Sequence, residues 1–344
     1  MLVNIILLSF MKYLIFVFKR RFRQKTLNNF LSVKRVKNVS ILNLSGPILY
    51  LVGKFLYFFL KSKKVIFISC DGLDYLYRET NSINLWMGGT TYKIPDKYKK
   101  YKNNFVSASS LFTDETKLLT FFPTNIYQGK MNNEYKFVYI SENKKVENKN
   151  SLKIWEENKD QILNDLTLID NIEFWKKFID INNENGQSFY VDIKSLIRLE
   201  LVGVLNSKLK DKFVLVGSNW KRHYPNALET NYSDKYIENL YRGNICIDLG
   251  SKNSEKCIYP RSCKIIESGG LLFQSINKDS KEIFRDLLDK TCFISLQDMK
   301  EKISFFLKNS DQIEDLLITQ QKNFESEDFN YKTIKKIENF IDSV

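Results

Sequence analysis

The chain has 344 residues, more than one typical domain, and 43% of them are hydrophobic, which is enough to fill two buried cores. Charged residues make up 27% and only five prolines occur, so the composition excludes a disordered or fibrous protein. The formal net charge of +13 comes from residues 1–70, which hold thirteen Lys and Arg but no Asp or Glu. The other 40 basic and 40 acidic residues cancel, so the charge does not indicate a nucleic-acid surface along the whole chain.

The N-terminal segment, residues 1–30, is both apolar and basic. Leu2–Phe18 is largely apolar, and Lys19–Arg23 follows it as a basic cluster. This composition is typical of a surface that meets anionic lipid; peripheral attachment, a membrane-spanning helix and a buried helix all remain open. No small-residue cleavage site follows, so we expect a cytoplasmic protein held at the inner face of the cell membrane by residues 1–64.

The N-terminal half is predicted to alternate strands and helices. Apolar runs bounded by turn or basic residues predict strands at 39–44, 65–70, 104–109 and 136–141 and helices at 47–60 and 151–183. Because strands that alternate with helices favour a parallel sheet, we expect a Rossmann-like domain over residues 31–204.

A second alternating unit begins at the continuous apolar run Phe213–Val216, which is typical of a strand buried on both faces. The segments predicted after it are strands at 244–249 and 271–274 and a helix at 260–268. The helix is well delimited, because Pro suits its first position and Gly suits the position after its end. We expect a second Rossmann-like domain over residues 205–325 and a C-terminal helix within 326–344.

Several site classes are not indicated by the sequence. The five cysteines form no CxxC pair, and neither HExxH nor DxD occurs. No GxGxxG follows a strand and no GxxxxGK[ST] is present, which argues against dinucleotide oxidoreductases and P-loop NTPases. We therefore expect neither a metal nor a resident cofactor.

From Tyr241 to Ser275 the sequence places an apolar strand, a helix led by Arg261, a Gly-Gly turn and a second apolar strand in succession. This order resembles the C-terminal domain of CgeB-like glycosyltransferases, relatives of the family 1 and family 4 enzymes, and the likeness is strongest over residues 205–325. The resemblance implies an α/β fold of the GT-B type, with two Rossmann-like domains facing across a cleft. It also implies a nucleotide-sugar donor bound mainly by the C-terminal domain.

The donor-binding residues expected in this segment are Tyr259, Arg261, Glu267, Ser268, Gly269 and Gly270. Arg261 would neutralise the diphosphate of the donor. Gly269 and Gly270 would let the backbone approach the ligand, although the two glycines can equally serve as a helix C-cap. The family's usual helix glutamate falls on Lys264 here, so Glu267, one turn later, would accept hydrogen bonds from donor hydroxyls.

The loop after the apolar run of the second unit resembles the first loop of the family's C-terminal domain. Gly217 and Ser218 would offer backbone N–H groups to phosphate, and Lys221 and Arg222 would neutralise it or simply be solvated. His223 is the only histidine and has an ordinary pKa near neutrality. We count it as a candidate for phosphate or acceptor contact, with a structural role as the alternative.

The general base is expected in the N-terminal domain. Asp71 directly follows a predicted strand, so its carboxylate should lie at the carboxyl edge of the sheet, where it could deprotonate an acceptor hydroxyl. Asp114 and Glu115 are competitors for this role, and each of the three acids can also be structural.

The sequence thus predicts a metal-independent glycosyltransferase that moves a hexose-type sugar from a nucleotide sugar to a glycan, glycolipid or protein acceptor. One alternative is a non-catalytic nucleotide- or sugar-binding protein on the same fold, because Lys264 stands where a glutamate is expected. A basic membrane- or nucleic-acid-binding protein is the other alternative. We expect an anionic membrane surface, and not a nucleic acid, as the macromolecular partner.

Overall fold

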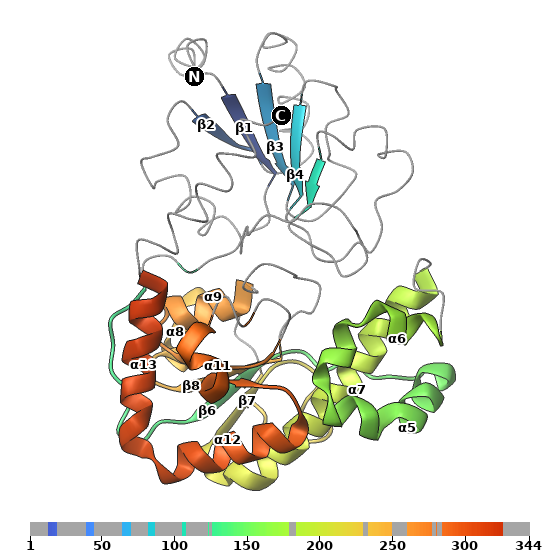
Figure 1. The fold of residues 1–344 in the computed structure, drawn as a ribbon, viewed down its shortest axis with the longest axis vertical. Coiled ribbons are helices and arrows are strands. Elements are labelled where there is room, and N and C mark those ends of the chain that lie inside the picture. The colour runs from blue at the N-terminus through green and yellow to red at the C-terminus, as the bar shows by residue number, and fades with distance from the viewer. Residues whose placement is uncertain are drawn as a thin grey trace. The chain divides into compact units, whose positions relative to one another are not determined.

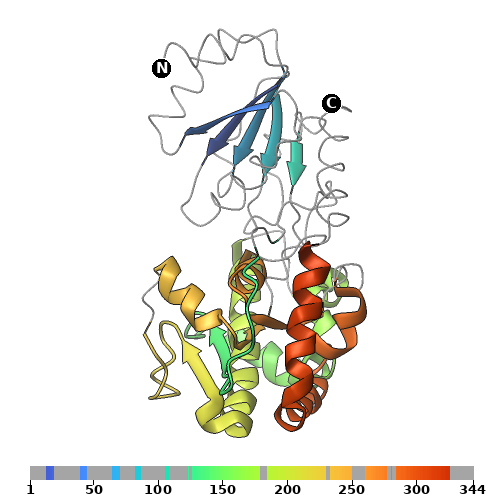
Figure 2. The same cartoon turned by 90° about the vertical axis from the view of Figure 1, so that its left-hand side faces the viewer.

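The chain forms two compact units, each built around one parallel β-sheet (Figures 1 and 2). The computed structural model describes residues 13–18, 39–44, 64–69, 82–86, 105–107, 123, 126–178, 184–229, 233–249, 260–276, 280 and 284–325. Unit 1 comprises Met1–Thr124, Asn253–Cys257 and Glu327–Val344, and unit 2 comprises Asn125–Lys252 and Ile258–Ser326. The expected α/β fold with two Rossmann-like sheets is therefore present.

The sheet of unit 1 has five parallel strands in the order β2-β1-β3-β4-β5. Their bounds are Tyr13–Phe18 for β1, Val39–Leu44 for β2, Lys64–Ser69 for β3, Ser82–Trp86 for β4 and Phe105–Ser107 for β5. The sequence predicts β2, β3 and β5 but neither β1 nor β4.

Strand β1 corrects the interpretation of the N-terminal segment. Tyr13–Phe18 pairs with β2 along one edge and with β3 along the other, so this part of the apolar run is a central strand. The residues cannot also belong to a helix that spans or lies on a membrane. No helix in the described part of the chain is long and apolar enough to cross a bilayer. The predicted helix at 47–60 lies outside the described residues, as does that at 326–344.

The sheet of unit 2 also has five parallel strands, in the order β10-β9-β8-β6-β7. Their bounds are Phe137–Ile140 for β6, Phe213–Val216 for β7, Ile245–Asp248 for β8, Leu271–Ser275 for β9 and Cys292–Phe293 for β10. Strands β6, β8 and β9 are buried throughout, as their continuous apolar sequences predict.

The domain boundary expected near residue 205 is wrong. Strand β6 lies between β7 and β8 and pairs with both, so residues 125–204 belong to unit 2. The sequence places 136–141 correctly as a strand but assigns it to the preceding sheet. Its partners come only after a long helical stretch, and a strand's own sequence does not reveal a distant partner.

Helices surround the sheet of unit 2 (Figure 1). Those between β6 and β7 are α5 (Lys149–Asn164), the 3₁₀ helix η3 (Leu166–Asp170), α6 (Ile172–Lys176), α7 (Glu184–Leu209) and the 3₁₀ helix η4 (Lys210–Lys212). The later ones are α8 (Asp234–Tyr241), α9 (Pro260–Glu267), η5 (Arg285–Leu287), α11 (Leu288–Thr291), α12 (Leu296–Lys308) and α13 (Ser310–Glu325).

The single helix predicted at 151–183 is divided by two caps. The Asp165 side chain accepts the Thr167 N–H at the start of η3, and that of Asn171 accepts the Phe174 N–H at the start of α6. Such side chains compete with helix continuation, because they bond locally to the backbone. The apolar residues of this stretch keep the sequence spacing of a single helix, although the helix itself is interrupted.

The core of unit 2 centres on aromatic contacts between the sheet and α12. The ring of Phe306 lies 5.3 Å from that of Phe273 and 6.2 Å from that of Phe137, measured between centroids. All three side chains are fully buried. These contacts place α12 on one face of the sheet. On the opposite face, α9 packs against β8 and β9.

Candidate functional site

The carboxyl ends of the unit 2 strands meet at one edge of the sheet, here called the carboxyl edge. From β6 the chain continues to β7 on one side, and β8 lies on the other side of β6. The strand order therefore reverses between β6 and β8, and in open α/β sheets ligands bind outside the carboxyl ends at such a switch point. The residues that follow these two strands, Ser141–Asn143 and Leu249, mark the place where a ligand is expected.

A buried carboxylate holds Arg261 at this edge. Asp248, the last residue of β8, is 0% exposed, and its Oδ1 accepts a hydrogen bond of 3.2 Å from an NH1 donor of Arg261. Its Oδ2 accepts one of 2.7 Å from the Ser262 hydroxyl, which also lies 3.2 Å from Oε1 of Gln274. Both carboxylate oxygens are thus occupied, and the charged pair orients the arginine side chain.

Arg261 combines fixed geometry with access to solvent. Pro260 begins α9, so Arg261 lies in the first turn of the helix, where backbone N–H groups lack helical partners. Its side chain is 23% exposed. A guanidinium has five donors in a planar fork, which suits phosphate oxygens, and the helix N-terminus favours an anion. The sequence identified this residue but missed Asp248, although an acid that ends the apolar strand Ile245–Asp248 is a readable signal.

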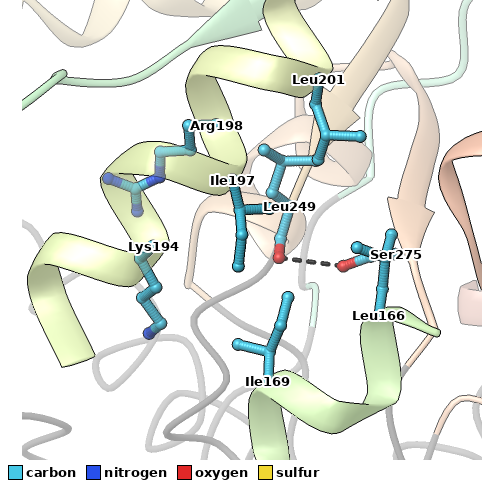
Figure 3. A pocket seen from close by; sticks show the side chains of 8 residues that line it. All are labelled: Leu166, Ile169, Lys194, Ile197, Arg198, Leu201, Leu249 and Ser275. Atoms are coloured by element: carbon cyan, nitrogen blue, oxygen red, sulfur yellow. Dashed lines mark hydrogen bonds between the residues drawn. The ribbon is translucent and has the colours of Figure 1, made fainter. Parts of the chain in front are cut away.

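A pocket opens at the same edge, on the other face of the sheet (Figure 3). It contains about 320 Å³ of space, part of it open to solvent, and it is lined by Leu166, Ile169, Lys194, Ile197, Arg198, Leu201, Leu249 and Ser275. Leu249 directly follows Asp248, and successive residues of an extended chain point to opposite faces. The pocket and Arg261 therefore flank the end of β8 from its two sides.

Two cations of α7 border this pocket. Lys194 and Arg198 are one helical turn apart, so they project from the same side of the helix. An NH1 donor of Arg198 reaches the carbonyl oxygen of Glu142 at 3.3 Å, which places it beside the chain leaving β6. Neither residue was predicted from the sequence. The signal that could have found them is two basic residues at helical spacing beside the apolar residues Ile197 and Leu201.

The structure explains the glycine at position 217 differently from the predicted phosphate contact. Its N–H donates to the carbonyl of Leu228 at 2.9 Å, so this donor is already used. A Cβ at this position would lie 1.8 Å from the carbonyl oxygen of Ser141, and φ is +144°. Gly217 therefore permits a close approach between the chains leaving β7 and β6. Ser218, its neighbour, accepts the Asn143 N–H at 3.2 Å through its carbonyl and stays half-buried.

Glu267, Ser268, Gly269 and Gly270 are not brought together with Arg261. They follow the C-terminus of α9 and precede β9, so they lie at the opposite, amino edge of the sheet. The N–H groups of Gly269 and Gly270 bond to carbonyls of the last helical turn, and φ of Gly269 is +79°. The glycines thus form the helix C-cap that was the alternative interpretation.

The side chain at position 264 also differs from what the expected donor site requires. Its ammonium group donates to Oε1 of Glu238 on α8, and the lysine side chain is only 9% exposed. An ammonium group has no acceptor, so it cannot receive hydrogen bonds from a sugar diol. The Lys264–Glu238 ion pair instead links α8 to α9, one helical turn after Arg261.

Arg222 and His223 lie exposed on the loop after β7. Trp220 anchors this loop, because it is fully buried and its Nε1–H donates to the Ser141 carbonyl at 2.7 Å. Asp71, Asp114, Glu115 and Tyr259 lie outside the described residues, so their predicted roles stay predictions.

The single histidine gives a direct titration test. Partial burial, and then the Arg222 charge, lower the pKa of His223 below its ordinary value of 6.5. Replacing Arg222 with glutamine should move this pKa upward, which proton NMR of untagged protein can measure on the only imidazole. Because the folded state binds this proton less readily, stability should fall slightly as pH drops through 6.5. An unchanged pKa would contradict the coupling.

The described residues show no metal or thiol centre. They contain no group of three or more His, Cys, Asp or Glu side chains that could hold a metal ion. Cys246, Cys263 and Cys292 are free and buried, and burial raises the pKa of the Cys292 thiol to about 12. Burial also raises the pKa of the Cys246 thiol, so Cys246 and Cys292 are neutral packing groups.

Comparisons with known proteins give structural neighbours only. No family model and no curated protein matches the chain. A solved structure of T4 phage β-glucosyltransferase is 12% identical, with a TM-score of 0.47 over 96% of this chain and 100% of the neighbour. A DNA-modifying β-glucosyltransferase, solved with and without uridine diphosphoglucose, is 10% identical with a TM-score of 0.46 over the same shares. The T4 phage enzyme in complex with UDP-glucose is 10% identical with a TM-score of 0.44, again covering 96% and 100%.

Proposed function

We propose that the protein is a glycosyltransferase whose nucleotide-sugar donor binds at the carboxyl edge of the unit 2 sheet. The observation that carries this proposal is the Arg261–Asp248 pair at the switch point, where a buried carboxylate fixes a partly exposed arginine. Lys194 and Arg198 add positive charge from the other side of the β8 end. A diphosphate is a ligand that such a set of cations suits.

The chemistry follows from this arrangement of charges. In the transfer, the acceptor oxygen forms a bond to the anomeric carbon while the bond from that carbon to the diphosphate oxygen breaks. Negative charge develops on the departing diphosphate, and preorganised cations stabilise it without a metal. Asp71 is our candidate to take the acceptor proton. We propose a hexose as the sugar and a glycan, glycolipid or protein as the acceptor.

We place the nucleoside part of the donor against the aliphatic wall at the mouth of this pocket. Its walls are aliphatic, from Leu166, Ile169, Ile197, Leu201 and Leu249. Small-molecule sites are mostly apolar with a few polar groups that fix orientation. The hydroxyl of Ser275 already donates to the Leu249 carbonyl at 2.9 Å (Figure 3). The α7 cations would then lie between the nucleoside and the diphosphate.

A thermal-shift screen against UDP, GDP, ADP and CMP tests the donor site. A ligand that binds the folded protein raises its melting temperature. Replacing Arg261 with alanine should weaken binding of the preferred nucleotide about ten- to hundredfold, since it removes a charge-assisted hydrogen bond. Because this variant also leaves Asp248 without its cation, Arg198→Ala serves as a second variant that spares the buried pair.

Arg242→Ala is the matched control, since Arg242 is exposed at the amino edge of the same unit. It should leave the nucleotide shift unchanged. Folded wild-type protein that responds to none of the nucleotides would contradict the donor site. Equal binding by wild type, Arg261→Ala and Arg198→Ala would place the nucleotide elsewhere.

A non-catalytic nucleotide-binding protein is the second candidate. The observation in its favour is that Lys264, paired with Glu238 of α8, occupies the α9 position where the family resemblance leads us to expect a carboxylate. Nucleotide-sugar binding without hydrolysis or transfer, across the three acceptor classes, would favour it. Release of free nucleotide that depends on an added acceptor would exclude it.

A further inference from the structure

The amino edge of the unit 2 sheet carries a cluster of exposed cations, opposite the donor site. Three of the segments at this edge carry the cluster: 126–136 before β6, 206–212 before β7 and 241–244 before β8. Their basic residues, here called the amino-edge patch, are Lys130, Lys136, Lys208, Lys210, Lys212 and Arg242. All are exposed except Lys136, which is half-buried.

Contacts between the segments join these residues into one surface. The Lys136 ammonium donates to the Asp211 carbonyl at 3.4 Å, and that of Lys212 lies 4.9 Å from the ring centre of Tyr135. On the other side, the Asn132 N–H donates to the Gly243 carbonyl at 2.9 Å. The patch is thus held on short, hydrogen-bonded connections.

The charge of this surface is unbalanced on its β7 side, where Lys136, Lys208, Lys210 and Lys212 outnumber Glu134 and Asp211. Toward β8 and β9 the charge is closer to balance, because Glu314 and Glu325 of α13 accept the Met131 N–H and the Gln128 amide, and Glu267 lies at the same edge. Like charges gathered without matching acids attract an anionic partner at low ionic strength.

The chemistry of the patch favours a lipid surface over a nucleic acid. Five of its six cations are lysines, whereas base and phosphate recognition draws on the planar fork of arginine and on exposed aromatic rings. The single arginine, Arg242, lies 4.2 Å over the ring of Tyr127, and Tyr135 is covered by Lys212. Tyr135 is thus buried, and Tyr127, which is 44% exposed, already lies against Arg242.

We propose that the amino-edge patch docks unit 2 onto a membrane containing anionic lipid. Each Lys or Arg near such a surface contributes about 1 kcal/mol, so several together give measurable attachment. The donor site, at the other end of the strands, would remain open to solvent during docking. This inference is independent of the proposed glycosyltransferase activity and of residues 1–64.

Vesicle flotation of the full chain tests this proposal. Wild-type protein should float with vesicles of phosphatidylcholine and phosphatidylserine but not with phosphatidylcholine alone, and added salt should release it. Reversing three charges, with Lys208→Glu, Lys210→Glu and Lys212→Glu, should weaken binding more than about tenfold. The nucleotide-induced thermal shift of this variant should match wild type.

The control changes the net charge equally at three exposed lysines on α5 and at the end of α6, with Lys153→Glu, Lys176→Glu and Lys177→Glu. It should retain most of the binding. An equal loss in both triple variants would show that net charge matters and the patch does not. Binding retained by the patch variant would assign attachment to another segment. Patch-dependent binding to duplex DNA without vesicle binding would overturn the membrane partner.

Discussion

Replacing Asp248 with asparagine should destabilise unit 2 by about 2–3 kcal/mol and weaken nucleotide binding. The substitution keeps the shape of the side chain but removes the charge that neutralises Arg261. Breaking a fully buried ion pair costs about 3–5 kcal/mol, and we expect the lower end because Arg261 is 23% exposed and can be partly solvated. Urea denaturation followed by tryptophan fluorescence measures the stability, and nucleotide titration measures the affinity.

Glu173→Gln is the comparison for this variant. Glu173 pairs with Lys176 on α6 and is 75% exposed, so its loss should cost less than about 1 kcal/mol. A double-mutant cycle with Arg261→Gln isolates the coupling. If Asp248 acts through Arg261, the arginine substitution should weaken nucleotide binding less in the Asp248→Asn background. Fully additive losses of affinity would contradict a positioning role.

Replacing Gly217 with alanine should be the most destabilising single methyl addition in the described loops, at about 3 kcal/mol or more. The added Cβ would lie 1.8 Å from the Ser141 carbonyl oxygen. The oxygen belongs to the backbone and a Cβ is fixed by the backbone that carries it, so neither can rotate away. The positive φ adds strain for any residue with a side chain. Thermal and urea unfolding should both show the loss.

Gly203→Ala is its control, since Gly203 lies within α7. A Cβ there would be 3.4 Å from the Tyr224 hydroxyl, and alanine favours helix by roughly 1 kcal/mol over glycine, so stability should hold or rise. Equal melting temperatures for Gly217→Ala and wild type would show that the β6 and β7 connections can separate. That result would again favour the prediction that Gly217 contacts phosphate.

Local sequence signals predicted most strands of the described chain but not their arrangement. Continuous apolar runs identified β2, β3 and β5 in unit 1 and β6 to β9 in unit 2 to within one or two residues. Strand β1 was missed because a short apolar run flanked by basic residues reads equally as a membrane-contacting segment. The boundary at 205 failed because pairing between β6 and β7 spans the whole helical stretch α5–α7.

The candidate site was predictable only in the part where a short sequence motif marks a single residue. Arg261 was found because an Arg-led helix belongs to the motif that this segment resembles, and Pro260 marks the helix start immediately before it. Asp248 and the α7 cations were visible in the sequence as a strand-ending acid and a basic pair at helical spacing, but only their packing against Arg261 and the pocket shows why they matter. The Gly269–Gly270 turn was ambiguous from sequence, and its place after α9 resolves it as a cap.

The central position of β6 bears on how unit 2 folds during synthesis. Both of its neighbours, β7 and β8, are made later, so on the ribosome β6 emerges with neither edge paired. The helices that follow it contact one another locally and can form first, whereas the sheet must wait for distant chain and a costly loop closure. An apolar strand with two open edges until β7 is made, and with one until β8 is made, is exposed to wrong partners, so the late strands protect the chain as well as complete its sheet.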